Sequence, residues 1–592
     1  MAGRLSLFSV FQAKESDLMK HARIKTRRPF YLLRWLVCMV ATLMAGGACR
    51  AQAVLQQPQG ATPWEQELNK YPGLLPEAGQ LIVKLQNNVH LPAARSESRL
   101  LPLLPESTVF YAAFPNYGDA AQQTLKTFRA ELQESAVLRD WWLHGEVAAT
   151  GPKVEDFVEK FGQFQGYLGD EIVLAGATDG REPSLLVIAE VRKPGLKGFL
   201  EQVIAQVAGN SKPGVRVLDP QQLAKLEDKG RGQEFMVLVR TDYVVGAADL
   251  KTLRSLNARL DQHSQGLAST AFGKRVVQEY SGGVVVLAAA DLQSMLSLLP
   301  PVARGEQTPL YQSGFGDVQY LVWDRKSVGA ESLSQSELTF IAPRHGAAAW
   351  LAKPAPLSTL DFVSPKPMMA LTVSLIKPTK IFEDAKVLVG SANPNAFTSL
   401  EQFEKILKLS LKDDLLSYLT GELTLELDEI NPPKMKWKAI LKVNDAAHLQ
   451  QTLNTLLATT HFETQHDESG AVAYNAVTIP SGATTTEIGY AFADGHLIVG
   501  SGREAVADAV ELHRTGGSLG KSKALAAALP PGRTLEASAV LYQDPVAMSM
   551  LQMRRFAPQM SNSLSHLAGQ GSPSVVGVYA EDTAIRENTD HR

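Results

Sequence analysis

The octapeptide YLGDEIVL at residues 167–174 returns as YLTGELTL at residues 418–425, an offset of 418 − 167 = 251 residues. Three further features keep their order at nearly the same offset. They are a leucine that opens an amphipathic helical pattern, a glycine that ends an apolar run, and an aspartate before a helical pattern: Leu196 with Leu449, Gly246 with Gly500, Asp291 with Asp544. Repetition at one fixed period is typical of duplicated structural units. The sequence therefore predicts an α+β fold made of two tandem homologous units.

Hydrophobic periodicity predicts similar strands and helices in the two units. Residues 435–443 alternate apolar side chains with mostly lysine, which predicts a half-buried antiparallel strand. Apolar residues at helical spacing follow both predicted strands, and we expect them to face the core in matched pairs: Leu196 with Leu449, Leu200 with Leu453, Val203 with Leu456, Ile204 with Leu457. We expect mixed or antiparallel sheets flanked by amphipathic helices.

Composition and proline placement predict five segments in 592 residues. They are a signal peptide at 1–53, an N-terminal helical arm at 54–100, a first α+β unit at 101–342, a connecting segment at 343–367, and a second α+β unit at 368–592. The strand at 574–580 is expected to be the last, followed by a polar tail.

The first 53 residues have the pattern of a secretory signal. Basic residues from Lys20 to Arg34 precede an apolar run from Trp35 to Ala48, and the small-residue site Ala51-Gln52-Ala53 follows. The apolar run is short for a bilayer span, although a retained anchor is the alternative. The pair Arg27-Arg28 is also compatible with the twin-arginine export route. We expect cleavage after Ala53.

Charge and cysteine content exclude several classes of protein. The leader carries nine basic and two acidic residues, so the net charge of −3 leaves −3 − 7 = −10 for the remainder. An acidic chain without a basic stripe argues against nucleic acid as partner. Both cysteines, Cys38 and Cys49, lie in the leader. The mature protein should therefore have no disulfide, no Cys-ligated zinc and no Cys nucleophile.

One motif would support an enzyme. Residues 516–520 read GGSLG, a match to G-x-S-x-G, with Asp544 and His566 as the downstream acid and histidine. A hydrolase needs a strand directly before this turn. The preceding residues 504–514 instead have a helical pattern, so Ser518 is predicted to lie in a turn between helices.

Two other motifs are weaker. Residues 461–468 hold His461, Glu463, His466, Asp467 and Glu468, which could bind a divalent metal but are expected to form a solvated loop. The S-x-x-K match at Ser374–Lys377 lacks its companion motifs. We nominate no catalytic, cofactor-binding or metal-binding residue and expect no cofactor.

One acidic position occurs in both copies of the octapeptide, as Glu171 and Glu422. A shared catalytic carboxylate would need a second acid or a histidine at a matched position, and the sequence has no duplicated histidine. Both residues are predicted to be polar residues at a strand entrance.

Residues 98–111, SRLLPLLPESTVFY, together with PNYG at 115–118 and the duplicated YLGDE unit, resemble a family of exported bacterial proteins known only as a domain of unknown function. The resemblance covers most of the mature chain. It implies export and a bacterial source, and it implies no activity, cofactor or catalytic residue.

These observations predict an exported protein of the periplasm or cell envelope that binds or supports a partner without catalysis. The partner is an unidentified protein or small molecule, with no nucleic acid and no stable membrane span after signal removal. The alternatives are a serine hydrolase using Ser518 and a carrier of a lipid or other apolar ligand. The carrier would require an apolar cavity between helices and sheet.

Overall fold

The computed structural model describes residues 67, 70–178, 183–208, 214–227, 234–262, 266–328, 331–393, 395–431, 434–460, 462–468, 472–481, 484–529, 534–547 and 573–591. All of them belong to the compact unit that starts at Ala61. The predicted signal peptide, with Cys38 and Cys49, lies outside the described residues.

The described strands form one sheet of 19 strands and one two-stranded sheet, which confirms the α+β class. The large sheet runs through both predicted units. Its N-terminal half contains β1 (Thr108–Pro115), β2 (Leu168–Thr178), β3 (Pro183–Val191), β4 (Val215–Leu218), β5 (Phe235–Val239), β6 (Tyr243–Ala247), β7 (Val286–Asp291), β8 (Val318–Val328) and β9 (Glu331–Phe340).

Its C-terminal half contains β11 (Met369–Ser374), β12 (Leu419–Asn431), β13 (Lys434–Val443), β14 (Glu463–Asp467), β15 (Tyr474–Ser481), β16 (Thr484–Ala493), β17 (His496–Gly500), β19 (Ala539–Gln543), β20 (Ser574–Ala580) and β21 (Ala584–His591). The small sheet pairs β10 (Ala355–Pro356) with β18 (Glu536–Ala537).

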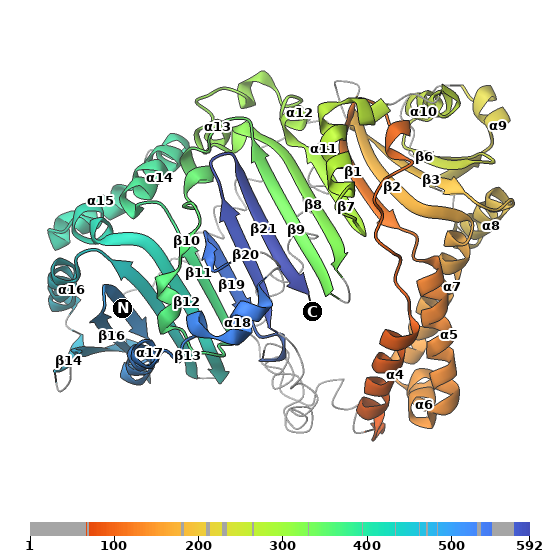
Figure 1. Cartoon of the computed structure of the whole chain (residues 1–592). Coiled ribbons are helices and arrows are strands. Elements are labelled where there is room, and N and C mark those ends of the chain that lie inside the picture. Colours follow the sequence, from red (N-terminus) through yellow and green to blue (C-terminus); the bar gives the residue numbers. More distant parts are fainter. Residues whose placement is uncertain are drawn as a thin grey trace, which may run out of the picture. The chain divides into compact units, whose positions relative to one another are not determined.

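The two halves of the large sheet have the same order of pairing. From the junction outward, the N-terminal half runs β9-β8-β7-β1-β2-β3-β6-β5 and the C-terminal half runs β21-β20-β19-β11-β12-β13-β17-β16. Strands β9 and β21 pair antiparallel and join the halves (Figure 1). Among the described strands, β4 and β5 are the one parallel pair. Matching order is what a duplication requires, and superposition of the two halves is the remaining test of that prediction.

The repeated octapeptide marks a β-bulge. The register of β2 against β3 shifts between Leu168 and Ile172, and the register of β12 against β13 shifts between Leu419 and Leu423. A bulge bends a strand and redirects a side chain. In both halves the glutamate of the octapeptide lies inside this irregular stretch.

Helices lie between the strands. The described ones that matter below are α4 (Leu74–Asn88), α5 (Gly118–Glu134), α6 (Ala136–His144), α7 (Gly151–Gln165), α8 (Leu196–Ala208), α10 (Leu250–Gln262), α11 (Ala271–Tyr280), α14 (Pro378–Ala392), α15 (Thr398–Leu407), α16 (Ala446–Thr460), α17 (Arg503–Thr515) and α18 (Lys523–Ala528). The predicted pair of core helices is α8, which follows β3, and α16, which follows β13. Leu196 and Leu449 are both buried, and the other three predicted pairs are half-buried.

Each half has its own core on one face of the sheet. The N-terminal core packs Tyr111, Val173 and Leu186 against residues of α10 and α11 and against Leu100–Leu104. The C-terminal core packs Ala370, Ile440 and Val540 against α17, α18 and the short helix η7 (Ser358–Phe362). The predicted connecting segment 343–367 therefore contributes Leu357, Leu360 and Phe362 to a core rather than only crossing between units.

The end of the chain differs from the prediction. The strand at Ser574–Ala580 is not the last, because β21 follows it and pairs along its length with β9. Residues 584–591 read AIRENTDH, and this polar composition suggested a tail. The partner strand β9 satisfies their backbone groups, so polarity alone did not exclude a strand.

Candidate functional site

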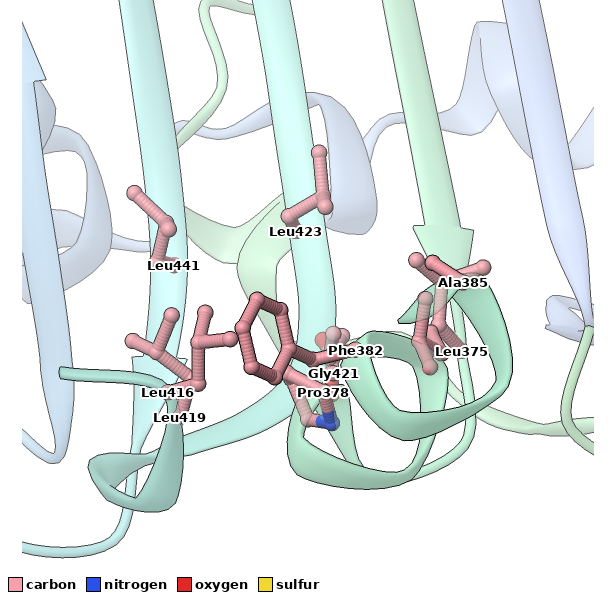
Figure 2. Close-up of a pocket in the computed structure, with 11 residues that line it drawn as sticks. Leu375, Pro378, Phe382, Ala385, Leu416, Leu419, Gly421, Leu423 and Leu441 are labelled. Carbon is pink, nitrogen blue, oxygen red and sulfur yellow. The ribbon is translucent and has the colours of Figure 1, made fainter. Parts of the chain in front are cut away.

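An apolar pocket lies between α14 and the sheet of the C-terminal half. Its volume is about 360 Å³. Apolar side chains from β11's end, α14, the turn before β12, β12 and β13 line it: Leu375, Pro378, Ile381, Phe382, Ala385, Leu416, Leu419, Leu423 and Leu441, with Gly421 and Glu422. In Figure 2 the ring of Phe382 points from α14 toward Leu416 and Leu419.

Local sequence explains the helical wall. Pro378 stands in the first turn of α14, where its missing N–H is not needed. Pro378, Ile381, Phe382 and Ala385 follow at i, i+3, i+4 and i+7, so they form one face of the helix. This face is turned toward the strands and forms the pocket wall.

Strand register explains the other wall. Leu423 in β12 pairs with Leu441 in β13, so both side chains project from the same face of the sheet. Gly421 adopts φ +103, and a Cβ there would approach the carbonyl oxygen of Leu375 to 2.4 Å. Only glycine fits this position of the bulge. The repeated octapeptide thus shapes the pocket floor.

Charged groups lie around this pocket rather than in its lining, apart from Glu422. Lys386 lies 5.3 Å from the centroid of the Phe382 ring. Lys412 Nζ lies 2.6 Å from Glu383 Oε1, and this hydrogen bond raises the pKa of Lys412 and lowers that of Glu383. The Lys412–Glu383 pair remains charged at neutral pH.

The two glutamates of the octapeptide are buried, which corrects the prediction of simple strand-entrance residues. In the N-terminal half, the hydroxyls of Ser98 and Tyr280 each donate to Glu171 at 2.6 Å, and Arg95 Nη1 lies 2.8 Å from it. Burial raises the pKa of Tyr280, so its hydroxyl stays protonated and donates. The carboxylate ties the segment before β1 to β2.

In the C-terminal half, Glu422 has the same role with different partners. Ser358 Oγ donates to Glu422 Oε1 at 3.0 Å and the Thr359 amide donates at 2.7 Å. Ser358 precedes β11 as Ser98 precedes β1. Lys442 Nζ lies 3.3 Å from the carboxylate. The carboxylate of Glu422 is thus satisfied by η7 and β13 and adds no free charge to the pocket.

A histidine adjoins this second cluster. His496 Nε2 lies 3.0 Å from Ser358 Oγ, and Nδ1 donates to the carbonyl oxygen of Asp494 at 2.8 Å. Burial lowers the pKa of His496, so the ring is neutral. The Thr359 amide, which could have served an oxyanion, is already bonded to Glu422. We therefore assign the cluster a structural role.

The residues nominated for a hydrolase are not assembled in the described chain. Helix α17 ends at Thr515, where a nucleophile elbow requires a strand. Ser518 is 2% exposed, and its Oγ has no hydrogen-bond partner among the described residues. Asp544 caps the amides of Val546 and Ala547. His566 lies outside the described residues.

The residues considered as metal ligands lie in a strand rather than in the predicted loop. Glu463–Asp467 form β14, which pairs with β15. His466 bonds Asn475 and Glu468, and Asp467 pairs with Arg503. His461 is outside the described residues, and those residues contain no group of three potential metal ligands. In the S-x-x-K match, Ser374 ends β11 and Lys377 precedes α14.

Sequence reasoning missed the pocket because its lining comes from separate segments whose apolar residues resemble ordinary core. It also missed a buried ion pair between β12 and β13, on the opposite face of the sheet from the pocket. Lys438 Nζ lies 3.0 Å from Glu426 Oε1, with both side chains fully buried. The sequence did contain a sign of this ion pair, because Lys438 stands between apolar residues. The alternating pattern was interpreted as placing Lys438 on the solvent-facing side of the strand.

Comparisons with protein-family models, with curated proteins and with solved structures return no match to this chain. The resemblance to a family of exported proteins therefore stays a prediction. Within the described residues, every helix is too short or too polar to cross a bilayer.

Proposed function

We propose that this protein is an exported, non-enzymatic binding protein that carries an apolar ligand in the pocket beneath α14. The observation that carries the proposal is a pocket of about 360 Å³ with an almost entirely apolar lining. Ligand sites in proteins commonly span about 300–1,000 Å³ and are mostly apolar. This choice favours the carrier among the alternatives raised by the sequence.

The lining defines the ligand class. Nine of the lining residues are apolar, and the one carboxylate among them, Glu422, is bonded to Ser358 and Thr359. A polar or charged ligand would lose its hydration without gaining partners. A single hydrocarbon chain, such as the acyl chain of a lipid or fatty acid, fits this chemistry. Its polar head would lie among the charged groups around α14, including Lys386 and Lys412.

Export is the second part of the proposal. The basic, apolar and small-residue regions of residues 1–53 support it, as does the absence of cysteine from residues 54–592. A carrier in the periplasm or envelope would move an apolar molecule through water. The intact mass of material from an exporting host should begin at Val54, and a mass that includes Cys49 would contradict cleavage at the predicted site.

Binding can be tested with a dansyl-labelled fatty acid, whose fluorescence rises in an apolar site. Ala385→Trp places a large ring inside the pocket, and we expect it to weaken binding by about tenfold or more. Val387→Trp is the matched control, because Val387 lies on the same helix, does not line the pocket and is 58% exposed. We expect this control to bind like the wild type.

Two results would contradict the pocket proposal. One is a wild-type protein that does not bind the probe. The other is an Ala385→Trp variant that binds as tightly as Val387→Trp while both keep the wild-type melting temperature.

A further inference from the structure

A buried carboxyl group lies close to the place where the two halves of the sheet join. Asp324 on β8 is 2% exposed, and it pairs with Leu287 on β7 and with Gln335 on β9. Gln335 in turn pairs with Asn588 on β21, the strand through which the C-terminal half joins β9 (Figure 1). Asp324 is therefore one strand away from the β9–β21 junction.

One oxygen of this carboxyl group lacks a hydrogen bond. Lys326 Nζ lies 3.0 Å from Oδ2 of Asp324. The other oxygen, Oδ1, is buried and has no hydrogen-bond partner among the described residues. A charged oxygen without a donor is costly in a protein interior. A proton on Oδ1 would remove the charge and give this oxygen a hydrogen bond to donate.

A second carboxyl group can accept that hydrogen bond. Glu279 on α11 is within hydrogen-bonding distance of Asp324, and a bond between two carboxyl groups requires a proton on one of them. Burial raises the pKa of Asp324 to about 7, and Glu279 adds to the rise. Burial also opposes ionisation of Glu279, but Arg275 and Lys326 hold its pKa below the usual range. The proton therefore resides on Asp324, which donates to the Glu279 carboxylate.

Ion pairs connect this carboxyl pair to the C-terminal half. Arg275 on α11 contacts both Glu279 and Glu337, and Glu337 lies on β9. Glu337 Oε1 lies 2.7 Å from Arg586 Nη2 on β21. The network therefore crosses from α11 to β9 and on to β21, and a charge that appears at Asp324 is felt at the junction.

The charges of the network balance when Asp324 is protonated. The cations that face the site are Arg275, Lys326 and Arg586, and the other carboxylates are Glu279, Glu337 and Glu581. Three positive charges thus meet three negative charges. Ionisation of Asp324 adds one negative charge that no further cation of this network offsets, and an uncompensated buried charge is destabilising.

A polar cavity of about 200 Å³ borders the site. Charged and amide side chains supply most of its lining, among them Glu279, Asp324, Glu337, Arg586 and Asn588. A polar cavity of this size has room for water. Because Arg586 is half-exposed, the cavity offers the proton a route between solvent and the buried carboxyl group.

We propose that Asp324 and Glu279 form a proton-binding site that controls how tightly β9 and β21 hold the two halves of the sheet together. The closed junction binds one proton between the two carboxyl groups. When that proton leaves, the two carboxylates repel each other and the ion-pair network up to Arg586 loosens. None of these residues lines the apolar pocket, so the inference does not depend on the proposed ligand.

The direction of the pH dependence follows from proton linkage. The pKa of Asp324 is higher in the folded chain than in an exposed aspartate, so the closed junction binds a proton that the opened junction releases. The stability that this proton contributes is complete below the ordinary pKa of aspartate. It is lost as the pH rises through about 7. Mild acid should therefore tighten the junction.

Hydrogen–deuterium exchange of the whole protein, read by mass spectrometry, measures the junction directly. The amides of β9 and β21 report on it, and those of β3, which carries none of these groups, serve as the internal reference. After correction for the intrinsic effect of pH, we expect exchange of β9 and β21 relative to β3 to rise about tenfold or more from about pH 5.5 to about pH 7.5.

Two variants remove the site and one control leaves it intact. Asp324→Asn is neutral at every pH, and Glu279→Gln removes the acceptor and the neighbouring negative charge, so both should reduce the pH dependence of exchange in β9 and β21. Asp582→Asn is the control, because the Asp582 side chain is 65% exposed and pairs with Lys353 instead. We expect the control to keep the wild-type pH dependence.

The wild-type measurement decides the proposal even if neither variant folds. Relative exchange in β9 and β21 that stays constant, or that slows, as the pH rises would overturn it. Folded Asp324→Asn and Glu279→Gln variants that both keep the full wild-type pH dependence would also overturn it.

Discussion

The two halves of the sheet carry the same strand order with different chemistry at matched positions. In the N-terminal half, Ala175 pairs with Leu186, and both are buried in an apolar core. At the corresponding place in the C-terminal half, Glu426 pairs with Lys438, and both are also buried. Burial raises the pKa of Glu426 above its ordinary value. One architecture thus tolerates either an apolar pair or an ion pair at its centre.

The helical hairpins differ in a second way. In the N-terminal half, α5 and α6 are covered by α4, where Tyr71, Leu74 and Leu138 form a buried cluster and Lys84 pairs with Glu131 (Figure 1). In the C-terminal half, α14 stands over an apolar pocket instead. The N-terminal helices thus pack against a further helix, whereas α14 in the C-terminal half borders an apolar pocket.

The largest expected effect comes from breaking the buried ion pair. Lys438→Met should lower the free energy of unfolding by about 3–5 kcal/mol, because Glu426 would be left without its partner. The double variant Glu426→Ala/Lys438→Leu introduces the pair found in the N-terminal half and should recover part of this loss, because Asp428, 3.4 Å from Lys438 Nζ, still loses its cation. Urea unfolding measures both. A single variant as stable as the wild type would contradict the assigned burial.

The second prediction compares substitutions in the two core helices. Leu196→Ala in α8 and Leu449→Ala in α16 should each lower the free energy of unfolding by about 2–5 kcal/mol, as for other buried leucines. Both leucines are almost inaccessible to solvent. Thermal and urea unfolding give the values. If one variant lost stability and the other did not, the predicted correspondence between α8 and α16 would be contradicted.

The sequence predicted the elements whose patterns are visible in both copies and missed a helix and a strand whose patterns are weaker. Repetition made several features recognisable, because each pattern occurs twice at nearly the same offset. These are the octapeptide, Leu196 with Leu449, and Gly246 with Gly500. The helix at 271–280 was missed, although Phe272, Val276 and Tyr280 form its buried face at helical spacing. Strand β21 was missed because its neighbour β9 lies about 250 residues away in sequence.

The pocket could not be derived from the sequence for a geometric reason. A cavity depends on the distance between α14 and the sheet, and neither Phe382 nor Leu423 differs by residue type from a core residue. The same holds for Glu171 and Glu422. Their duplication was visible, but their burial depends on Ser98 and Ser358, which lie more than 60 residues away in sequence.

The third prediction compares substitutions of the two octapeptide glutamates. Glu171→Gln should lower the free energy of unfolding by about 1.5–3 kcal/mol, since a charged acceptor of several hydrogen bonds is lost. Glu422→Gln should have a smaller effect, because its cation Lys442 is more exposed than Arg95 and is screened by water. Urea unfolding of both variants at neutral pH tests the order. The reverse order would contradict the assigned partners.

The smallest effect is expected at Ser518. Ser518→Ala should change the free energy of unfolding by less than about 0.5 kcal/mol or stabilise the fold slightly, since it removes a buried hydroxyl that has no partner among the described residues. Ligand binding should be unchanged. Loss of an esterase or peptidase activity in this variant would contradict the non-enzymatic account.

Native mass spectrometry of the exported protein tests ligand carriage most directly. The wild type and the Val387→Trp control should carry one bound molecule whose fragmentation yields an acyl or other hydrocarbon chain. The Ala385→Trp variant, with its pocket filled, should lack it. An unoccupied wild type from every exporting host and lipid supplement, or an Ala385→Trp variant that retains the same adduct, would contradict the account.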